Sequence, residues 1–332
     1  MKTAIIGLGV IGKVHLETLI MQGRTVSALC DIDAEEAKKA AERFGCDVPI
    51  FTDFRAMLDE ISPDAVHVCT PHYLHAEMVI ELLSRDINVL CEKPLCIKKS
   101  DIPRILEAEK KSKAILGVCH QNRYLDSVNF VKDYLKDKEV SSAHGSVIWK
   151  RGADYYNSAE WRGTKDKEGG GVLINQALHT LDLVQYLCGE PEYVTASADN
   201  LSLKGVIEVE DTISAVFDGK TPFTFFATIA SPGDLPVEIK IKLKSKEILT
   251  LLPSAVIANG QYIEFPKKVI QTSGKPCYGS GHFYLFNDFY SCLAEGKHFA
   301  IDGEEGAKVV RMILSSYESK GEKIKISPSL KI

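Results

Sequence analysis

The stretch from Asn88 to Cys96, NVLCEKPLC, combines an apolar run with three residues that could support chemistry. The run is typical of a buried strand, and Glu92, Lys93 and Pro94 stand at its end. A lysine in that place gives up hydration, which costs free energy unless a partner or a ligand compensates it. Its ammonium group could donate to a nearby oxygen and stabilise negative charge that develops there. The alternative is a solvated lysine at a strand end, followed by a loop proline.

A second stretch, residues 172–188 (VLINQALHTLDLVQYLC), has the period of a helix with two different faces. Its apolar residues share one face, and the other face carries Asn175, His179, Asp182 and Tyr186. This polar stripe lacks the Lys and Glu of a solvated surface. It favours a helix with one side in a core and the other side lining a cleft. Three glycines, 169–171, precede it and leave room for a ligand or a neighbouring backbone. His179 is the natural proton carrier, because imidazole titrates near neutral pH; the alternative is a structural histidine.

The elements that must position these residues alternate in the first part of the chain. Apolar runs typical of strands are separated by helical patterns, and the runs cover residues 3–9, 25–31, 64–71, 87–94 and 114–120. Nearly continuous apolar strands that alternate with helices indicate a parallel sheet covered on both faces. We therefore expect a first domain of α/β class over residues 1–122.

The motif GLGVIG lies directly after the first expected strand and directly before a helix. In that context Gly7 permits a tight turn, Gly9 lets a pyrophosphate approach the backbone, and Gly12 allows the helix to pack closely on the strand. The start of the helix, at Val10 and Ile11, offers free N–H groups to phosphates. The motif predicts a doubly wound Rossmann sheet that binds a dinucleotide. The alternative is an ordinary glycine turn.

Asp31 ends the second expected strand, close to the place where an acidic residue binds the adenosine ribose. Its carboxylate would accept hydrogen bonds from both ribose hydroxyls and repel a 2′-phosphate. The next residues are Ile32 and Asp33, so no Arg or Lys follows directly to receive that phosphate. The expected cofactor is therefore NAD, and NADP is less favoured.

The pattern changes after about residue 122, where strands follow one another with little helix between them. These runs alternate apolar and polar residues and cover 192–199, 211–219, 222–231, 237–245 and 247–253. We expect an α+β domain over residues 123–332, built on a large, mostly antiparallel open sheet for substrate binding and oligomerisation. Its last helix, at about 303–320, is expected to pack back on the first domain.

Few helices remain to cover both faces of this second sheet. We expect an uncovered face that carries residues such as Phe223, Phe225 and Ile229. An apolar face of that kind is a ready interface, and the prediction is a homodimer or homotetramer formed through the sheet.

Five motifs, in this order, resemble the Gfo/Idh/MocA family over nearly the whole chain: GLGVIGKVH, CDID, VCTPHYLHAEMVIELL, CEKPL and EGGGVLINQALHTLDLVQYLCG. The resemblance implies an N-terminal Rossmann domain, a C-terminal open-sheet domain, NAD(P), and sugar or cyclitol substrates. It also implies that Lys93 lies beside the nicotinamide and the substrate hydroxyl, and that the Lys93–Pro94 bond is cis. A helix of the second domain would present Asn175 four residues before His179.

Further contacts follow from the resemblance. Thr70 and Pro71 would run under the cofactor, with His72 and His75 close to the nucleotide, although a structural role at the helix start is equally open for either histidine. Glu92 would support the cofactor or Lys93.

Asn122 and Arg123 would line the cleft, and Arg123 could instead form an interdomain ion pair. Trp161 and Arg162 would lie near cofactor or substrate, or form a buried aromatic with a surface arginine. Tyr278 is a candidate for substrate contact.

These residues predict an NAD-dependent dehydrogenase that oxidises a secondary hydroxyl of a sugar, cyclitol or sugar derivative. Hydride would pass to the nicotinamide and the proton to His179 or Lys93. Cyclitol-oxidising members carry Asp where this chain has Asn175, and an amide cannot take a proton, which argues against a strict inositol dehydrogenase. One alternative is a glycosidase that recycles NAD through a redox-elimination cycle. Another is a non-catalytic, dinucleotide-sensing regulator, which could dispense with Lys93 and His179.

Composition limits the partners further. The 332 residues have a formal net charge of −5 and no block of Lys and Arg, so neither nucleic acid nor an anionic membrane is expected. No apolar run has the length of a transmembrane helix. The nine cysteines are scattered, which is typical of reduced thiols and predicts a cytoplasmic protein.

Two other chemistries are not expected. Cys69, His72 and His75 lie three residues apart but cross from a strand end to a helix start, so they need not converge and no metal is predicted. A hydrolase of the nucleophile-elbow type would carry G-x-S-x-G, and the sequence has no such motif.

Overall fold

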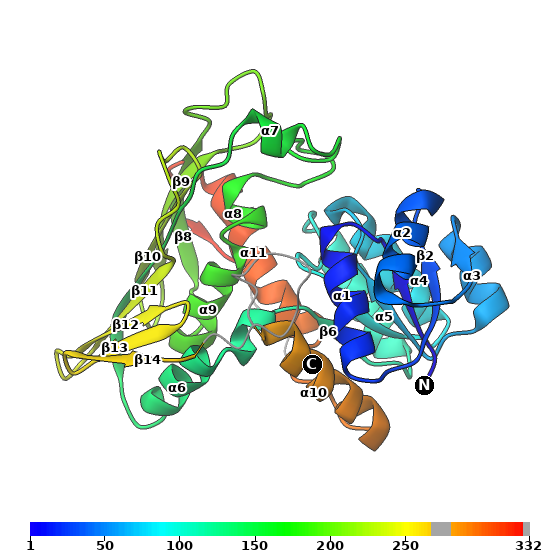
Figure 1. Cartoon of the computed structure of the whole chain (residues 1–332). Coiled ribbons are helices and arrows are strands. Elements are labelled where there is room, and N and C mark those ends of the chain that lie inside the picture. Colours follow the sequence, from blue (N-terminus) through cyan, green and yellow to red (C-terminus); the bar gives the residue numbers. More distant parts are fainter. Residues whose placement is uncertain (267–279, 328–332) are drawn as a thin grey trace. The chain divides into compact units, whose positions relative to one another are not determined.

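The computed structural model describes residues 1–266 and 280–327, which form two compact units (Figure 1). Unit 1 contains residues 1–96, 100–124 and, among the described residues, 280–306. Unit 2 contains 97–99, 125–266 and 307–327. The contacts thus divide the chain after Tyr124, where the sequence pattern predicted a division after residue 122. They add α10 (Gly281–Glu295) to unit 1, because this helix packs on α1 (Val10–Met21) and on the short η2 (Gln121–Tyr124).

Unit 1 is built on a parallel sheet in the order β3-β2-β1-β4-β5-β6, which is the Rossmann order. The strands are β1 (Thr3–Ile6), β2 (Val26–Cys30), β3 (Ile50–Phe51), β4 (Ala65–Val68), β5 (Asn88–Cys91) and β6 (Leu116–Val118). The remaining helices are α2 (Ala34–Phe44), α3 (Phe54–Ile61), the short η1 (His72–Leu74), α4 (His75–Ser84) and α5 (Asp101–Lys111). Every residue of β1 and β4 is buried, as expected for strands covered on both faces. The predicted fold class of the first domain is confirmed.

Unit 2 is built on a sheet in the order β14-β13-β12-β11-β7-β10-β9-β8-β15. Neighbouring strands are antiparallel except for β7 and β10, which run parallel. The strands are β7 (Val140–Ile148), β8 (Tyr193–Asp199), β9 (Thr212–Asp218), β10 (Phe223–Thr228), β11 (Glu238–Leu243), β12 (Ile248–Leu252), β13 (Ala255–Ala258), β14 (Gln261–Glu264) and β15 (Ile324–Lys325). The large, mostly antiparallel sheet predicted for the second domain is confirmed.

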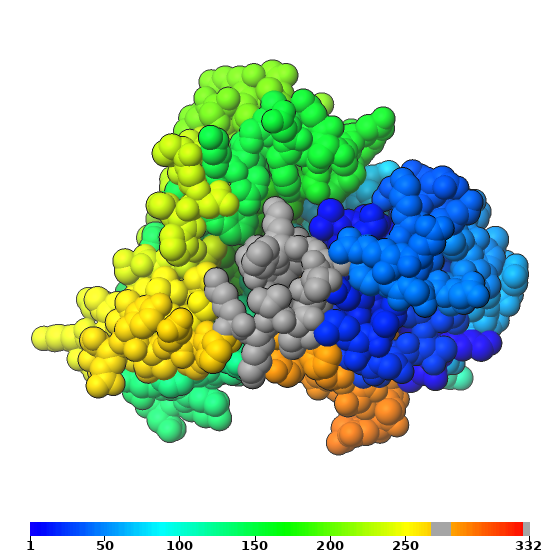
Figure 2. All heavy atoms as spheres, viewed as in Figure 1, coloured from blue at the N-terminus to red at the C-terminus, as the bar shows by residue number. Residues whose placement is uncertain are grey.

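The helices of unit 2 lie on one side of this sheet, and several of them pack on it (Figure 1). They are α6 (Asp126–Leu135), α7 (Ala153–Tyr156), α8 (Val172–Asn175), α9 (Leu178–Cys188) and, from Ala307 onward, α11 (Gly303–Ser319). Helix α9 packs on β7 and β11, and α8 on β9 and β10. Helix α6 packs on β12 and β13, and their atoms adjoin in Figure 2.

Within residues 1–266 and 280–327, no helix is both long and apolar enough to cross a membrane.

The prediction of which residues lie on the uncovered face is wrong. Phe223, Phe225 and Ile229 are only 2%, 1% and 1% exposed. The Phe225 ring and the Val184 side chain both press on Gly145, where a Cβ would lie 2.9 Å from the ring and 3.0 Å from Val184. Val184 belongs to α9, so Phe225 faces the helices. The alternating pattern defined two faces but did not indicate which one the helices cover.

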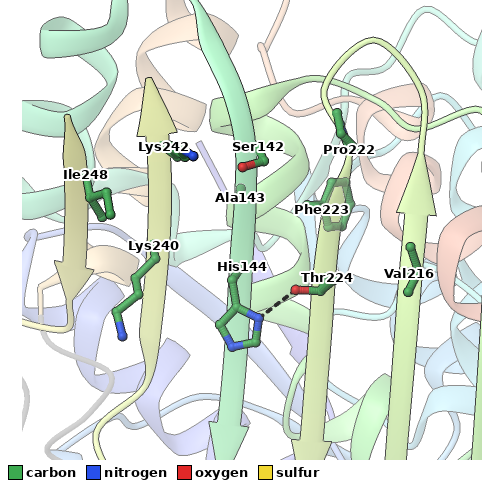
Figure 3. Close-up of a pocket in the computed structure, with 10 residues that line it drawn as sticks. All are labelled: Ser142, Ala143, His144, Val216, Pro222, Phe223, Thr224, Lys240, Lys242 and Ile248. Carbon is green, nitrogen blue, oxygen red and sulfur yellow. Dashed lines mark hydrogen bonds between the residues drawn. The ribbon is translucent and has the colours of Figure 1, made fainter. Parts of the chain in front are cut away.

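The opposite face of the sheet is covered by no helix within the described part of the chain. It exposes Val216 at 51% and Ile248 at 53%, and a shallow pocket there is lined also by His144, Thr224 and Lys240 (Figure 3). The ring of His144 lies 2.8 Å from the Thr224 hydroxyl on the neighbouring strand. This face mixes isolated apolar side chains with lysines, in contrast to the aromatic face beneath the helices.

Candidate functional site

The glycine turn of unit 1 leaves room on one side only. Gly7 has a φ of +91°, and a Cβ there would lie 2.6 Å from the Cys69 carbonyl oxygen. A Cβ on Gly12 would overlap the carbonyl oxygen of Gly7, whereas a Cβ on Gly9 would meet no atom of the described residues within 4 Å. Two of the three glycines are therefore demanded by the packing of the turn. Gly9 borders open space, as a backbone that a phosphate approaches must.

The start of α1 has the properties of an anion-binding site. The helix begins at Val10; Gly9, the N-cap residue before it, has no side chain to cap the helix, and the first turn contains no acidic residue. Val10 is 60% exposed and Ile11 is half-buried. Unsatisfied N–H groups and the positive end of the helix dipole then point to the same place. The turn therefore fits the pyrophosphate of a dinucleotide.

Asp31 stands beside this turn at the end of β2. One of its carboxylate oxygens, Oδ2, accepts a hydrogen bond from the Leu8 N–H at 2.6 Å, and Oδ1 accepts from the Asp33 N–H at 3.0 Å. Both bonds hold the carboxylate at the carboxyl edge of the sheet. Ile32, the next residue, is 94% exposed. The position fits the ribose contact that the sequence predicts.

The loop after β4 is fixed by a histidine. His75 is buried, and its Nε2 and Nδ1 lie 2.8 Å from the Thr70 carbonyl and 2.7 Å from the Pro94 carbonyl. It therefore bridges the loops that follow β4 and β5, a structural role at the start of α4. Pro71 is half-buried and His72 is buried in η1.

The turn after β5 holds Lys93 by its backbone. The Lys93–Pro94 peptide bond is cis, as the resemblance implies. Glu92 is 4% exposed, and its Oε2 accepts the Lys93 N–H at 3.2 Å. Its Oε1 lies 3.0 Å from His15 Nε2 and 3.4 Å from His282 Nε2.

Burial alone would raise the pKa of Glu92, but hydrogen bonds from the two histidines hold that pKa well below its usual range. Burial also lowers the pKa of His15. We take Glu92 as ionised and His15 as neutral, because N–H groups donate to both carboxylate oxygens.

The neighbouring segment before unit 2 contributes an ion pair. Arg123 is 4% exposed, and its Nη1 lies 2.8 Å from Glu305 Oε1, within unit 1. The alternative that the sequence left open for Arg123 was an interdomain ion pair, whereas the pair with Glu305 lies inside unit 1. Substrate contact by Arg123 and cofactor contact by Asn122 stay predictions. Tyr278 lies outside the described residues.

In unit 2, the helix predicted over residues 172–188 is interrupted, which corrects the sequence-based expectation. Helix α8 ends at Asn175, and α9 begins at Leu178. The Ala177 N–H bonds to the Val172 carbonyl at 2.9 Å, one residue further back than in an α-helix. This wider turn changes the phase between Asn175 and His179.

The polar stripe is correspondingly divided. Asp182 is 1% exposed, and its Oδ1 accepts from Gln185 Nε2 at 3.2 Å. The Tyr186 hydroxyl accepts a hydrogen bond from Lys132 Nζ of α6. Asn175 and His179, at the end of α8 and the start of α9, are half-buried and remain the candidates for substrate contact.

Asn175 is oriented by a buried carboxylate that the sequence analysis missed. Its Nδ2 donates to Glu168 Oε1 and lies 3.2 Å from the Tyr155 hydroxyl. Glu168 is fully buried, and its Oε2 accepts the Gly163 N–H. Burial raises the pKa of Glu168 to about 7. The available signal was the acidic residue directly before the glycine run.

The glycines 169–171 are packed against the protein itself. A Cβ on Gly169 would lie 2.5 Å from Ile97 Cβ, one on Gly170 would overlap the Tyr317 hydroxyl, and one on Gly171 would overlap the Glu210 carbonyl. The sequence left open whether these glycines make room for a ligand or for a neighbouring part of the protein. In the structure, neighbouring parts of the protein lie against them.

Glu210 is a second buried carboxylate that the sequence did not reveal. It accepts hydrogen bonds from the N–H groups of Gly171 at 2.8 Å and Leu173 at 3.0 Å, and from the Tyr317 hydroxyl at 2.9 Å. Burial raises its pKa. The carboxylate therefore fixes the start of α8.

Arg162 and Trp161 form a stacked cluster with Tyr155. The guanidinium carbon of Arg162 lies 4.6 Å from the Trp161 ring centroid and 4.4 Å from that of Tyr155, and Arg162 donates to the Tyr155 hydroxyl. Arg162 is thus held by aromatic neighbours in unit 2, and its contact with cofactor or substrate stays a prediction.

Comparison with known proteins places these features in a family. Residues 1–120 match the model of an oxidoreductase family with an NAD-binding Rossmann fold, GFO_IDH_MocA, and residues 139–243 match the GFO/IDH/MocA C-terminal domain. The chain is 24% identical to a myo-inositol 2-dehydrogenase from Thermotoga maritima, over 97% of each chain. It is 28% identical to a 2,7-anhydro-N-acetylneuraminate hydratase from Mediterraneibacter gnavus, over 61% of this chain and 53% of that protein.

A solved structure is similar over the whole length. The WlbA dehydrogenase from Bordetella pertussis, in complex with NADH and UDP-GlcNAcA, has a TM-score of 0.85 and 25% identity, and the match covers 99% of both chains. The two family models together span more than half of this sequence. The chain therefore belongs to the Gfo/Idh/MocA family of oxidoreductases and carries that family's NAD-binding Rossmann domain.

Proposed function

We propose that this protein oxidises a secondary hydroxyl of a sugar, cyclitol or sugar derivative, with NAD as the hydride acceptor. The observation that carries the proposal is the carboxyl edge of the unit 1 sheet. The open glycine turn follows β1, and the turn with Lys93 follows β5 of the same parallel sheet. Ligands of such sheets bind at this edge, where the strand order reverses. A lysine with a fixed backbone therefore stands at the edge where a dinucleotide would bind.

The chemistry follows from the residue types. As hydride leaves the substrate carbon for the nicotinamide, the hydroxyl proton must leave the oxygen. His179 can accept that proton, and the Lys93 ammonium can donate a hydrogen bond to the same oxygen while it carries negative charge. Asn175, oriented by Glu168, can hold a neighbouring substrate hydroxyl but cannot take a proton. Relatives that act on an inositol and on an anhydro sugar acid, and a structural neighbour with a bound nucleotide sugar, support the substrate class.

The test is a panel of cyclitols, sugars, anhydro sugars and nucleotide sugars, each incubated with the protein and NAD. Absorbance at the NADH wavelength follows hydride transfer directly. The proposal predicts NADH formation that is first order in enzyme with at least one class. It is wrong if no class yields NADH.

A second candidate is a reaction in which NAD is reduced and reoxidised within one turnover. It is favoured by the similarity to a hydratase, since hydration of an anhydro sugar is not a net oxidation. Product analysis by mass spectrometry distinguishes the two. Net oxidation lowers the carbohydrate mass by two hydrogens and accumulates NADH, whereas hydration adds one water and leaves NAD unchanged.

We also propose that the protein self-associates through the open face of the unit 2 sheet. The exposed side chains there include Val216 and Ile248, and Lys240 and Thr224 stand beside them (Figure 3). A second copy would cover these apolar groups. Light scattering at micromolar concentration is expected to give a dimer or tetramer, and Val216→Lys is expected to shift it toward monomer. A monomeric wild-type protein would contradict the proposal.

A further inference from the structure

Unit 1 contains a chain of polar side chains in its core that the proposed chemistry does not use. Glu92 Oε1 lies 3.0 Å from His15 Nε2, and His15 Nδ1 lies 2.8 Å from His67 Nδ1. His67 Nε2 then lies 2.9 Å from the Tyr290 hydroxyl, which lies 2.9 Å from the Thr3 hydroxyl. All five side chains are buried, at 4% exposure or less. Buried polar groups are costly unless each finds a partner, so the arrangement needs an account.

The position of every proton in this chain is determined by its carboxylate end. An ionised Glu92 can only accept, so His15 donates from Nε2, and its Nδ1 is left as an acceptor. His67 must then donate from Nδ1, which leaves its Nε2 to accept the Tyr290 O–H. Burial lowers the pKa of both histidines, which keeps the rings neutral as this pattern requires. Each hydrogen bond of the chain then contains one proton, and all the donors point in the same direction, toward Glu92.

Other groups border the chain without interrupting it. His282 Nε2 lies 3.4 Å from Glu92 Oε1, and Cys119 Sγ lies 3.9 Å from His15 Nε2. The Arg24 guanidinium stands 4.0 Å from the Tyr290 ring centroid. The Phe286 ring lies against both His15 and His67, at 4.7 and 4.8 Å between centroids. The imidazoles are therefore locked by aromatic packing as well as by hydrogen bonds.

The carboxylate end of the chain is attached to the candidate active residue. Glu92 Oε2 accepts the backbone N–H of Lys93 at 3.2 Å. Rotation of the Glu92 carboxylate would break this bond, and the bond to His15 opposes that rotation. The links beyond His15 fix its ring in turn. The hydrogen-bond chain thus connects Tyr290 of α10 and Thr3 of β1 to the backbone N–H of Lys93.

We propose that Tyr290 and His67 are positioning residues for Lys93, acting through His15 and Glu92. The inference rests on the proposed function for its activity readout, because it assumes that Lys93 acts on the substrate oxygen. A misplacement of a catalytic group by about 1 Å can cost on the order of 10²-fold in rate. Loss of the Tyr290 hydroxyl is therefore expected to lower kcat about 10- to 100-fold while KM for NAD stays within about twofold.

The first test needs no substrate. Nitrogen-15 NMR of histidine-labelled protein is expected to show His15 protonated at Nε2 and His67 protonated at Nδ1. Hydrogen exchange of the Lys93 amide is expected to become faster in Tyr290→Phe. Tyr124→Phe is the matched control, because Tyr124 donates to Asp288 of the same helix α10 at 2.5 Å but lies outside the chain. That control is expected to leave the Lys93 amide unchanged.

Three results would overturn the proposal. The first is the opposite pair of tautomers. The second is an unchanged Lys93 amide in Tyr290→Phe. The third is a stoichiometric metal ion, found by elemental analysis, on His15, Glu92 and Cys119, whose ligand atoms lie within 4.8 Å of one another, because a metal-bound His15 Nε2 carries no proton. If the wild-type protein oxidises no substrate, only the proposed function fails. The two NMR measurements still test whether the hydrogen-bond chain positions Lys93.

Discussion

Glu168 gives a quantitative prediction about stability and pH. Its carboxyl is fully buried, and burial raises its pKa from 4.5 to about 7. Between these pH values the folded protein keeps a proton that the unfolded chain has released. The contribution of Glu168 to the free energy of unfolding therefore falls as the pH rises from 4.5 to 7 and is constant above that range. The full loss corresponds to about 3 kcal/mol, at about 1.4 kcal/mol for each tenfold change in proton affinity.

Substituting glutamine for Glu168 removes this loss, because the amide is neutral at every pH. We expect Glu168→Gln to gain about 3 kcal/mol of stability relative to wild type between pH 4.5 and pH 8, whatever its offset at pH 4.5. The assay is urea unfolding followed by tryptophan fluorescence. Both tryptophans, Trp149 and Trp161, lie in unit 2 with Glu168, so the signal reports on the correct unit.

The exposed Glu322 supplies the matched control, since Glu322→Gln removes a carboxyl of the same unit that is not buried. Its stability relative to wild type is expected to stay constant over this pH range. Parallel pH dependences for wild type and Glu168→Gln would show that the Glu168 carboxyl gains no proton affinity on folding. In that case the explanation that burial raises the pKa of Glu168 would be refuted.

Three further results are expected. Calorimetry should show tighter binding of NAD than of NADP, and Asp31→Ala should reduce that difference; equal affinities in wild type would contradict the assignment of Asp31 to the ribose. Lys93→Met and His179→Ala should each lower turnover by about 10² to 10⁴-fold with NAD affinity nearly intact, and the double variant should lose less than the product of the two effects. A His179→Ala variant with wild-type turnover would make that residue structural. Gly12→Ala should cost about 1–3 kcal/mol of stability through overlap with the preceding turn, whereas Gly9→Ala should fold normally and bind NAD more weakly; thermal melts and calorimetry separate the two.

The sequence predicted best the features that short segments determine. The roles of Gly7, Gly9 and Gly12 depend on a turn between adjacent elements, and the structure provides the close approaches at Gly7 and Gly12 and the open side at Gly9. The Rossmann sheet followed from continuous apolar runs that alternate with helices. Lys93 was placed at a strand end because the apolar run stops there. Most of these constraints come from near neighbours in sequence or from a regular pattern, as Gly7 constrains Gly12; the approach of the Cys69 carbonyl to Gly7 comes from a more distant segment.

Features that depend on distant residues were missed or misplaced. Phe223 and Phe225 were assigned to the uncovered sheet face because alternation defines faces without naming their neighbours, and the covering helix α9 comes from an earlier segment. The break between α8 and α9 falls inside a run of apolar residues at helical spacing, so the sequence pattern does not reveal it. The contacts that explain the glycine run come from Glu210 and Tyr317, far along the chain.

The two units solve a common problem in the same way. Lys93 and Asn175 each lie beside a loop whose backbone N–H groups need fixed acceptors. In unit 1 the buried Glu92 accepts the N–H of Lys93, and in unit 2 the buried Glu210 accepts from Gly171 and Leu173 at the start of the helix that carries Asn175. A buried carboxylate is costly to desolvate, so it persists only where several donors meet it. Removing one donor therefore leaves charge unsatisfied, and the disturbance reaches the loop rather than staying at the mutated side chain. Rigid placement of the reactive groups in this fold thus depends on acids that take no part in the proposed chemistry.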